Sequence, residues 1–580
     1  MCHWELPARH GLLLYPWVGS QSWWLLLLLL GFHPVCGQCP EQCQCVRTAQ
    51  VECSGAGITA VPSPIPANAV TLQIVNTRIT ELGEASFGNA SLLIGLRIEK
   101  NDLRHVSPDA FQHLPDLRYL SLASNKLQEL PVQVFQPLGK LESLLLSSNQ
   151  LLRVEPDHFA HLSNLKELQL HGNNLRELTE GLFDQLASLT KLNLARNNLD
   201  RLPPRAFERL PQLQVLRLYE NRLRHIPAGA FDALPELQEL GLHQNQLEML
   251  SPELFVHNEN LQKLYLSNNL LTALPAGIFL PLRALSKITL HVNRLRDISP
   301  AAFGPMPNLR ELWLYENELA ALPAAVFSNL TQLQLLVLSK NQLRSLAPGA
   351  FRGLGELLEL SLHSNALHRL DAGALGGMPK LQNISLQNNR LQTLPHRLFA
   401  ATPRLQHIQL HANTLESLPA GIFSPLSAVR EVKLHNNSWR CDQAILPLRA
   451  WLEANPSKVG ETPPVCAQPA PLRGTPIAEL RQDQLPTARP SSPLPAHPSQ
   501  EVLPSGPHTT LPATPMSREE EEEDEGRGWW GLTRTQSAVV GAVIVLLCVA
   551  LLCALVALVV YGCRKKSHVV LMRMKAPNEA

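Results

Sequence analysis

The sequence predicts an α/β-type solenoid of stacked repeats, with a parallel β-sheet on its concave face and irregular or 3-10 segments on its convex side. Three observations predict this fold. A leucine motif recurs with a fixed period, a row of phenylalanines follows the same period, and the cysteines that bracket the repeats lie only at their two ends. One repeat of this kind cannot bury its own core, so stability is expected to come from stacking neighbours.

The leucine motif is Leu-x-x-Leu-x-Leu-x-x-Asn-x-Leu, and it recurs every 24 residues without an insertion. Leu-x-Leu has the period of a short strand, so its leucines face the interior and the residues between them face the concave surface. The Asn follows at the bend, where its amide can pair with main-chain groups of its own coil and the adjacent one. This pattern predicts a leucine-rich-repeat solenoid of 16 units, with Thr77 in the first Asn slot. The repeat Asn residues are Asn101, Asn125, Asn149, Asn173, Asn197, Asn221, Asn245, Asn269, Asn293, Asn317, Asn341, Asn365, Asn389, Asn413 and Asn437.

A row of phenylalanines supports the same register. Of the 15 Phe residues, 14 lie at 24-residue steps, and Leu375 fills the one vacant position. We expect their rings to stack under the convex side as a continuous apolar spine. The row consists of Phe87, Phe111, Phe135, Phe159, Phe183, Phe207, Phe231, Phe255, Phe279, Phe303, Phe327, Phe351, Phe399 and Phe423.

The cysteines around the repeats predict disulfide-bonded caps. No Cys lies between Cys53 and Cys441. An even number bunched at two ends indicates disulfides formed in an oxidising compartment, and a solenoid needs caps because its terminal coils would otherwise expose apolar core. A zinc site in the N-terminal group is the disfavoured alternative. The six residues are Cys39, Cys43, Cys45, Cys53, Cys441 and Cys466.

The segments outside the repeats predict a single-pass type I membrane protein. The apolar run at 23–32 is too short to cross a bilayer, which needs about 20 residues, so a signal peptide cut near Gly37 is expected. Residues 538–561 carry no charge and are followed by Arg564, Lys565 and Lys566, which places that end in the cytoplasm. We therefore expect an extracellular ectodomain at the plasma membrane and a short cytoplasmic tail that signals through a cytoplasmic or lateral co-receptor. The expected parts are a signal peptide at 1–37, an N-terminal cysteine cap at 38–68, repeats at 69–437, a C-terminal cap at 438–467, a Pro/Ser/Thr stalk with an acidic run at 468–537, a transmembrane helix at 538–562 and a tail at 563–580.

The caps carry a resemblance to a known family. The motif Cys39-Pro40-x-x-Cys43-x-Cys45, the 24-residue coils and the end cap Trp439-Arg440-Cys441-Asp442 resemble the extracellular leucine-rich-repeat family that includes platelet glycoprotein V, the Nogo receptor and Slit. The resemblance implies a plasma-membrane glycoprotein of cell–cell and cell–matrix contacts that promotes migration. Fibronectin, laminin and collagen are the ligands it implies.

The same resemblance implies the disulfide pairs. In that family the first of the four N-terminal cysteines pairs with the third and the second with the fourth, which implies Cys39–Cys45 and Cys43–Cys53. The family's end cap usually has four cysteines. Since only Cys441 and Cys466 are present here, a single bridge is implied.

Function is expected to be binding and not catalysis. The chain has no Gly-rich phosphate loop and no His-Glu-x-x-His motif, so we expect no enzyme activity, cofactor or metal. A net charge of +1 argues against a general nucleic-acid partner. The main hypothesis is an adhesion receptor for extracellular-matrix or cell-surface proteins. A pattern-recognition receptor and an inhibitory binder of a protease or growth factor are the alternatives.

Histidines repeat on the expected concave face. Six occupy the slot two residues before a repeat Asn, and we expect them to be solvated there. A metal site at His411 and His435, with His407 as third ligand, is a disfavoured alternative. If the six charged together near pH 6, ligand affinity would change with pH. They are His171, His243, His291, His363, His411 and His435.

Aromatic residues single out one part of the concave face. The four Tyr and one Trp of the repeats all fall in outward slots, and all except Tyr119 lie between residues 219 and 315. Rigid aromatic residues ringed by charges are the composition of a binding hot spot, and Trp313 is the expected anchor. The predicted ligand-binding residues are Tyr219, Tyr265, Trp313, Tyr315, Arg217, Lys263, Glu311 and Glu316.

Two further surface features are expected. Sequons predict glycans at Asn89, Asn329, Asn383 and Asn436, of which the last two would face the concave side. Arginine recurs three residues after the repeat Asn in five coils, which makes a heparin-binding ridge an alternative to the aromatic surface. These five are Arg104, Arg176, Arg224, Arg296 and Arg344.

Overall fold

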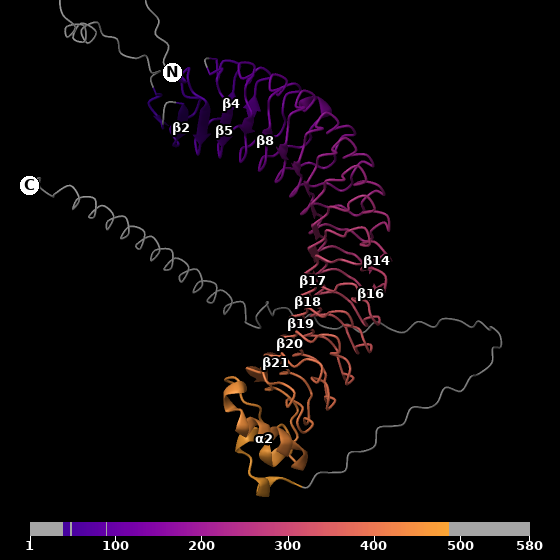
Figure 1. The fold of residues 1–580 in the computed structure, drawn as a ribbon. Helices are drawn as coiled ribbons and strands as arrows, with labels where there is room; N and C mark the ends of the chain where they lie inside the picture. Colours follow the sequence, from indigo (N-terminus) through magenta and orange to yellow (C-terminus); the bar gives the residue numbers. More distant parts are fainter. Residues whose placement is uncertain (1–38, 47–48, 89, 487–580) are drawn as a thin grey trace, which may run out of the picture. The chain divides into compact units, whose positions relative to one another are not determined.

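The computed structural model describes residues 39–46, 49–88 and 90–486 (Figure 1). All of them belong to the first of two compact units, Met1–Ser491, and the second unit, Ser492–Ala580, contains none. Within these ranges, no helix is long and apolar enough to cross a membrane. The expected signal peptide, membrane helix and tail lie outside the described residues, and so does the stalk beyond residue 486.

An 18-stranded sheet lines the concave side of the coils (Figure 1). β1 (Cys43–Cys45) pairs antiparallel with β2 (Gln50–Ser54), and each later strand pairs in parallel with its counterpart in the preceding coil. The register follows the repeat, since Leu192 lies opposite Leu216. The other strands of this sheet are β3 (Thr71–Val75), β5 (Gly95–Glu99), β7 (Tyr119–Ser121), β8 (Ser143–Leu145), β9 (Glu167–Gln169), β10 (Lys191–Asn193), β11 (Val215–Arg217), β12 (Glu239–Gly241), β13 (Lys263–Tyr265), β15 (Lys287–Thr289), β17 (Glu311–Trp313), β18 (Leu335–Val337), β19 (Glu359–Ser361), β20 (Asn383–Ser385), β21 (His407–Gln409) and β22 (Glu431–Lys433).

The convex side consists mostly of turns. Within the described part of the repeats, η1 (Pro156–His158) is the single 3-10 helix, and no coil contains an α-helix. Two short parallel pairs lie away from the concave sheet (Figure 1): β4 (Glu81–Leu82) with β6 (His105–Val106), and β14 (Ala273–Leu274) with β16 (Asp297–Ile298). The convex side is therefore irregular, as expected, but it has fewer 3-10 segments than expected and no α-helix in the described part of the repeats.

The phenylalanine row forms the expected spine. Every ring in it is buried, and successive centroids in the stacked pairs lie 5.8 to 6.5 Å apart. Leu375 is also buried and occupies the gap between Phe351 and Phe399. At the C-terminal end the indole of Trp451 packs on Phe423 with ring centroids 4.6 Å apart. The spine thus continues into the cap.

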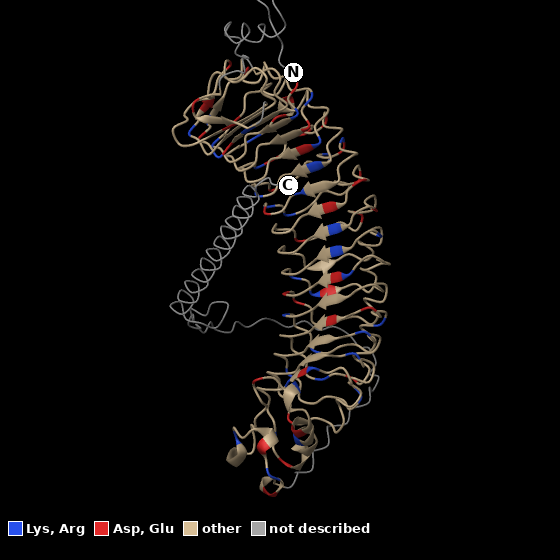
Figure 2. Ribbon diagram, turned by 60° about the vertical axis from the view of Figure 1, so that its left-hand side comes forward, with Lys and Arg blue, Asp and Glu red and all other residues tan. Residues whose placement is uncertain are grey.

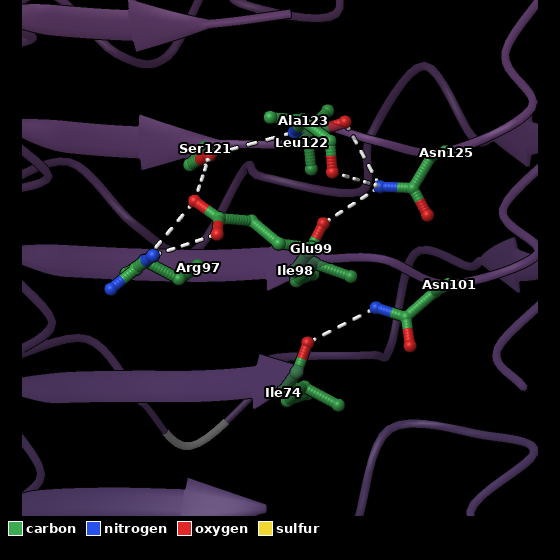
Figure 3. A network of polar contacts seen from close by, with 9 residues as sticks. All are labelled: Ile74, Arg97, Ile98, Glu99, Asn101, Ser121, Leu122, Ala123 and Asn125. Atoms are coloured by element: carbon green, nitrogen blue, oxygen red, sulfur yellow. Dashed lines mark hydrogen bonds and ion pairs between the residues drawn. The ribbon is translucent and has the colours of Figure 1, made fainter. Parts of the chain in front are cut away.

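The repeat Asn residues form a continuous ladder of hydrogen bonds. Asn245 Nδ2 donates to the carbonyl of Leu242 in its own coil and to that of Leu218 in the coil before, both at 3.0 Å. Asn221 also donates to Leu218, so this carbonyl accepts from two Asn side chains, and the same holds for its counterparts from Leu122 to Leu410. Figure 3 shows the start of the ladder, where Asn125 reaches the carbonyls of Ile98 and Leu122.

Each Asn also accepts a hydrogen bond, and the turn before it is strained. The amide of Leu223 donates to Asn245 Oδ1 at 3.1 Å, and the same contact recurs along the solenoid. The residue before each repeat Asn adopts a positive φ, for example 53° at Glu220 and 54° at Val292. This conformation costs an L-residue about 1–2 kcal/mol, and the ladder bonds hold it in place.

Disulfides staple both caps. The structure forms Cys39–Cys45, Cys43–Cys53 and Cys441–Cys466, which are the pairs that the resemblance implied. At the N-terminus β1 covers the edge of the sheet that β2 would otherwise expose. At the C-terminus the buried Trp439 donates from Nε1 to the carbonyl of Leu434 at 3.0 Å. Trp439 thereby supplies the donor that a further repeat Asn would have provided.

The C-terminal cap extends past residue 467, where its end was expected. It contains η2 (Gln443–Ile445), α2 (Leu446–Ala454), η3 (Pro456–Lys458), η4 (Ala470–Leu472), η5 (Ile477–Glu479) and η6 (Gln482–Gln484). Ile477 and Leu480 are fully buried, and η5 packs on α2. These apolar residues give the first part of the Pro-rich segment enough buried surface to fold onto the solenoid.

Candidate ligand-binding surface

The strands place four side-chain columns on the concave face. Residues two, four and six positions before each repeat Asn alternate with buried leucines, and a fourth column directly precedes the Asn. Charged residues of both signs lie on neighbouring strands of this face, without a regular order (Figure 2). The surface is therefore mixed in charge, and its distinguishing feature is aromatic.

Six rings form two clusters on adjacent coils, which we call the aromatic band. Its members are half-buried and come from the columns two and four residues before the Asn. They are Tyr219, His243 and Tyr265 in one cluster and His291, Trp313 and Tyr315 in the other.

In the first cluster His243 lies between two tyrosines. Its ring stacks on Tyr219 at 4.4 Å between centroids and meets the edge of Tyr265 at 5.8 Å. Gly241 leaves room for the Tyr219 ring, because a Cβ at position 241 would approach that ring to 3.3 Å.

The second cluster surrounds Trp313. His291 stacks on Tyr315 at 4.5 Å with the rings 8° from parallel, and Trp313 meets both rings edge-on. The indole Nε1 donates to Glu311 at 3.1 Å, which fixes the orientation of the side chain. Aromatic pairs of this geometry stabilise one another by about 0.5–1.5 kcal/mol, so the indole of Trp313 is held in place by its neighbours.

Charged residues at the band are held by ion pairs within the chain. Arg217 and Lys263 both pair with Glu239, at 2.9 and 3.6 Å. Glu311 lies 4.0 Å from Lys287, and Glu316 lies 2.6 Å from Lys340. The predicted charged residues thus lie beside the aromatic rings, together with partners that the sequence prediction missed.

The concave histidines are not the solvated side chains that were expected. Burial lowers the pKa of all six below the usual value, and in His171, His363, His411 and His435 nearby cations lower it further. Among the described residues, Nδ1 of His243, His291 and His411 is buried without a hydrogen-bond partner. Protonating that atom would bury an unpaired N–H, so the neutral rings are favoured and charging needs a lower pH than was assumed.

Three histidines were considered for a metal. The rings of His411 and His435 stack at 4.5 Å, whereas His407 Nδ1 contacts the side-chain oxygen of Asn383 at 2.9 Å. In the described ranges no group of three or more His, Cys, Asp or Glu side chains is arranged to hold a metal ion.

The sequons differ in position. Asn329 is exposed on the convex side, and its Nδ2 lies 3.3 Å from the carbonyl of Phe303. Asn383 starts β20 on the concave face, and Asn436 is exposed with a φ of 52°. Asn89 lies outside the described residues.

The sequence pattern of the family described as "Leucine rich repeat" matches the chain at residues 67–127, 139–199, 187–247, 235–295, 283–343, 331–391 and 379–438. The chain belongs to the leucine-rich repeat family. Members of this family typically bind other molecules and do not catalyse reactions. The aromatic band lies entirely within the matched repeats.

Individual leucine-rich repeat proteins match parts of the chain. Over 98 residues it is 53% identical to leucine-rich repeat-containing protein 15 of Homo sapiens, an alignment that covers 17% of this chain and 15% of that protein. Over 103 residues it is 33% identical to Reticulon-4 receptor-like 1 of Mus musculus, covering 18% and 23%. Each alignment thus spans less than a quarter of the relative's length. A solved leucine-rich repeat protein of Leptospira interrogans matches with a TM-score of 0.53 at 27% identity and covers 70% of this chain and 94% of that one.

Proposed function

We propose that this protein is a cell-surface adhesion receptor that binds extracellular-matrix or cell-surface proteins through the aromatic band. The proposal places the repeats outside the plasma membrane, with the signal peptide, transmembrane helix at 538–562 and short tail as expected from the sequence. It further places the chain close to leucine-rich repeat-containing protein 15, with which it shares its most similar segment among the relatives described. Fibronectin, laminin and collagen are the candidate ligands, as the resemblance implies.

The aromatic band is the observation that carries this proposal. Its rings are half-buried, stacked and fixed by neighbours, so a partner would not have to order them on binding. Binding hot spots combine aromatic anchors with surrounding polar groups that exclude water, and the paired charges of Glu239, Glu311 and Glu316 provide such a rim.

The test is the double variant Trp313→Ala, Tyr315→Ala in the full-length chain. Binding to immobilised fibronectin, laminin and collagen is measured for each protein. Removing the anchor should make the binding free energy less favourable by about 2 kcal/mol or more, which raises Kd roughly 30-fold. Folding should be intact, because neither side chain is part of the leucine core.

Tyr119→Ala is the matched control. Tyr119 also projects from a concave strand, β7, but lies four coils before the band and stacks on no other aromatic ring within the described residues. It should bind as the unmodified chain does. Unchanged binding by the double variant, or an equal loss in the control, would refute the proposed site.

A further inference from the structure

A row of cations follows the repeat Asn on one flank of the solenoid. The residues one, three and four positions after the Asn form this row, which we call the flank strip. In each of six successive coils, from Asn101 to Asn221, at least one of these positions holds Lys or Arg. The next two coils have none. The cations are Arg104, Lys126, Arg153, Arg176, Arg201, Arg222 and Arg224.

Two hollows open along the strip. The larger has a volume of 940 Å³ and is lined by Arg176, Arg201, Arg222, Arg224 and His225, with Asp200 as its one carboxylate. The second, of 500 Å³, is lined by Arg104, Lys126 and Arg153 together with Glu129. Both hollows belong to the same positions of neighbouring coils, so they lie in series along one flank.

Several of these cations have no internal partner. Lys126, Arg153 and Arg201 pair with Asp102, Glu155 and Glu177. In contrast, Arg104, Arg176, Arg222 and Arg224 form no ion pair and no side-chain hydrogen bond within the described part of the chain. Three of those four line the larger hollow. Their planar guanidinium groups can each donate two parallel hydrogen bonds to an oxyanion.

We infer that the flank strip binds a linear sulfated polysaccharide. At least one cation per coil, repeated at the strand spacing of about 4.8 Å, matches a ligand whose charges are also spread along a line. Over six coils the strip is about 24 Å long. The same positions also hold four carboxylates, Asp102, Glu129, Glu177 and Asp200, against the seven cations. The strip therefore keeps an excess of positive charge, whereas the net charge of the whole chain is +1, so this positive field is a local feature of one flank.

Other polyanions fit the strip less well. Of its positions in these six coils, Leu152 is the single large apolar residue and none is Phe, Tyr or Trp, so it lacks the anchors of a protein hot spot. Single-stranded nucleic acids bind largely by stacking successive bases on aromatic side chains, and the strip offers only His105 and His225, at its two ends. The disulfides of the caps indicate an oxidising compartment, where sulfated polysaccharides are the abundant linear polyanions.

The test uses the full-length chain and heparin oligosaccharides of increasing length. The triple variant Arg176→Gln, Arg222→Gln, Arg224→Gln should weaken heparin binding about tenfold or more and lower the slope of log affinity against log salt by about 2 to 3. The control is Arg352→Gln, Arg397→Gln, Arg404→Gln. It removes the same charge from exposed convex arginines and should change the affinity by less than about twofold.

The ligand class is tested in the same assay with desulfated heparin, polyglutamate and polyuridine RNA. Affinity should rise with heparin length until the oligosaccharide spans about 24 Å and then level off. Equal losses in the two triple variants, or none in the first, would overturn the site. Binding of desulfated heparin, polyglutamate or RNA as tight as that of heparin would overturn the class of ligand.

Discussion

The Asn ladder makes a quantitative prediction at Asn245. Replacing it with Ala leaves the amide of Leu223 buried without an acceptor, because Asn245 Oδ1 is its hydrogen-bond partner. An orphaned donor of this kind costs about 1–3 kcal/mol. The carbonyls of Leu218 and Leu242 each lose one donor but keep another, from Asn221 and Asn269, at a cost of about 0.5–1 kcal/mol each. The total is about 3 kcal/mol.

Hydrogen exchange measures this loss at the site itself. Because a long solenoid need not unfold in one step, local opening is a better measure than a single unfolding midpoint. The protection of the Leu223 amide should fall about 100-fold in Asn245→Ala, which corresponds to the expected 3 kcal/mol. Amides several coils away should keep theirs.

Asn174→Ala is the matched control for this variant. Asn174 is exposed, and its side chain makes one contact of 3.5 Å, to the carbonyl of Gln150. Its removal should leave exchange near it within about twofold of the unmodified chain. If the Leu223 amide stays protected in Asn245→Ala, the side-chain oxygen of Asn245 is not the acceptor that stabilises it, and the expected loss of 3 kcal/mol is refuted.

The C-terminal cap, the strained turns, the concave histidines and the sequon at Asn329 can each be tested by a substitution. Trp439→Phe removes one of the two side-chain donors to the carbonyl of Leu434, which keeps Asn437, and should destabilise the C-terminal coils by about 0.5–1 kcal/mol, measured by their exchange rates against those of the N-terminal coils. Val292→Asn replaces a β-branched residue at a φ of 54° with one that tolerates this conformation, and it should stabilise its coil by about 1 kcal/mol. Unfolding in urea should then be slower than in the unmodified chain, and an unchanged rate would contradict backbone strain at this position. Burial lowers the pKa of His243 and His291, so the unfolded chain takes up protons first and the free energy of unfolding falls as the pH drops below about 6.5. The double variant His243→Gln, His291→Gln should show a shallower dependence of the thermal midpoint on pH, and an unchanged slope contradicts this. Asn329 should carry a glycan that Asn329→Gln abolishes, as peptide mass spectrometry can check.

The repeat lattice was predictable because each position of a coil has one structural role. Leu in the strand, Asn at the bend and Phe in the spine recur at fixed offsets, so sequence alone determined register, sheet and core. The cap boundary was less predictable. The segment around Ile477 and Leu480 is rich in proline, and its folding depends on burial against α2, which composition does not reveal.

The aromatic band was predictable only in part. The tyrosines and Trp313 were identified by their slots, whereas His243 and His291 were expected to be solvated. Their stacking depends on the rings of adjacent coils tilting toward one another, and on Gly241 leaving room for Tyr219. Such contacts join residues 22 to 24 positions apart. They can therefore be found only by comparing the side chains of adjacent coils across the concave face, and not by considering each slot alone.

The ladder carbonyls that accept two hydrogen bonds also determine how such a chain can change length. Each coil offers the next coil a backbone carbonyl, as in Leu218, and a backbone amide, as in Leu223, and the Asn of the next coil pairs with both. Every coil therefore has the same two groups on the side that faces its successor. Deleting or duplicating a segment of 24 residues would therefore rejoin matching surfaces, whereas any other length would misalign the Asn. The aromatic band does not share this tolerance, because losing the coil of His243 would bring Tyr219 and Tyr265 onto neighbouring strands without the ring between them. Gene duplication could thus lengthen this scaffold in whole coils, whereas the proposed recognition surfaces would constrain the order of the coils that carry the flank strip and the aromatic band.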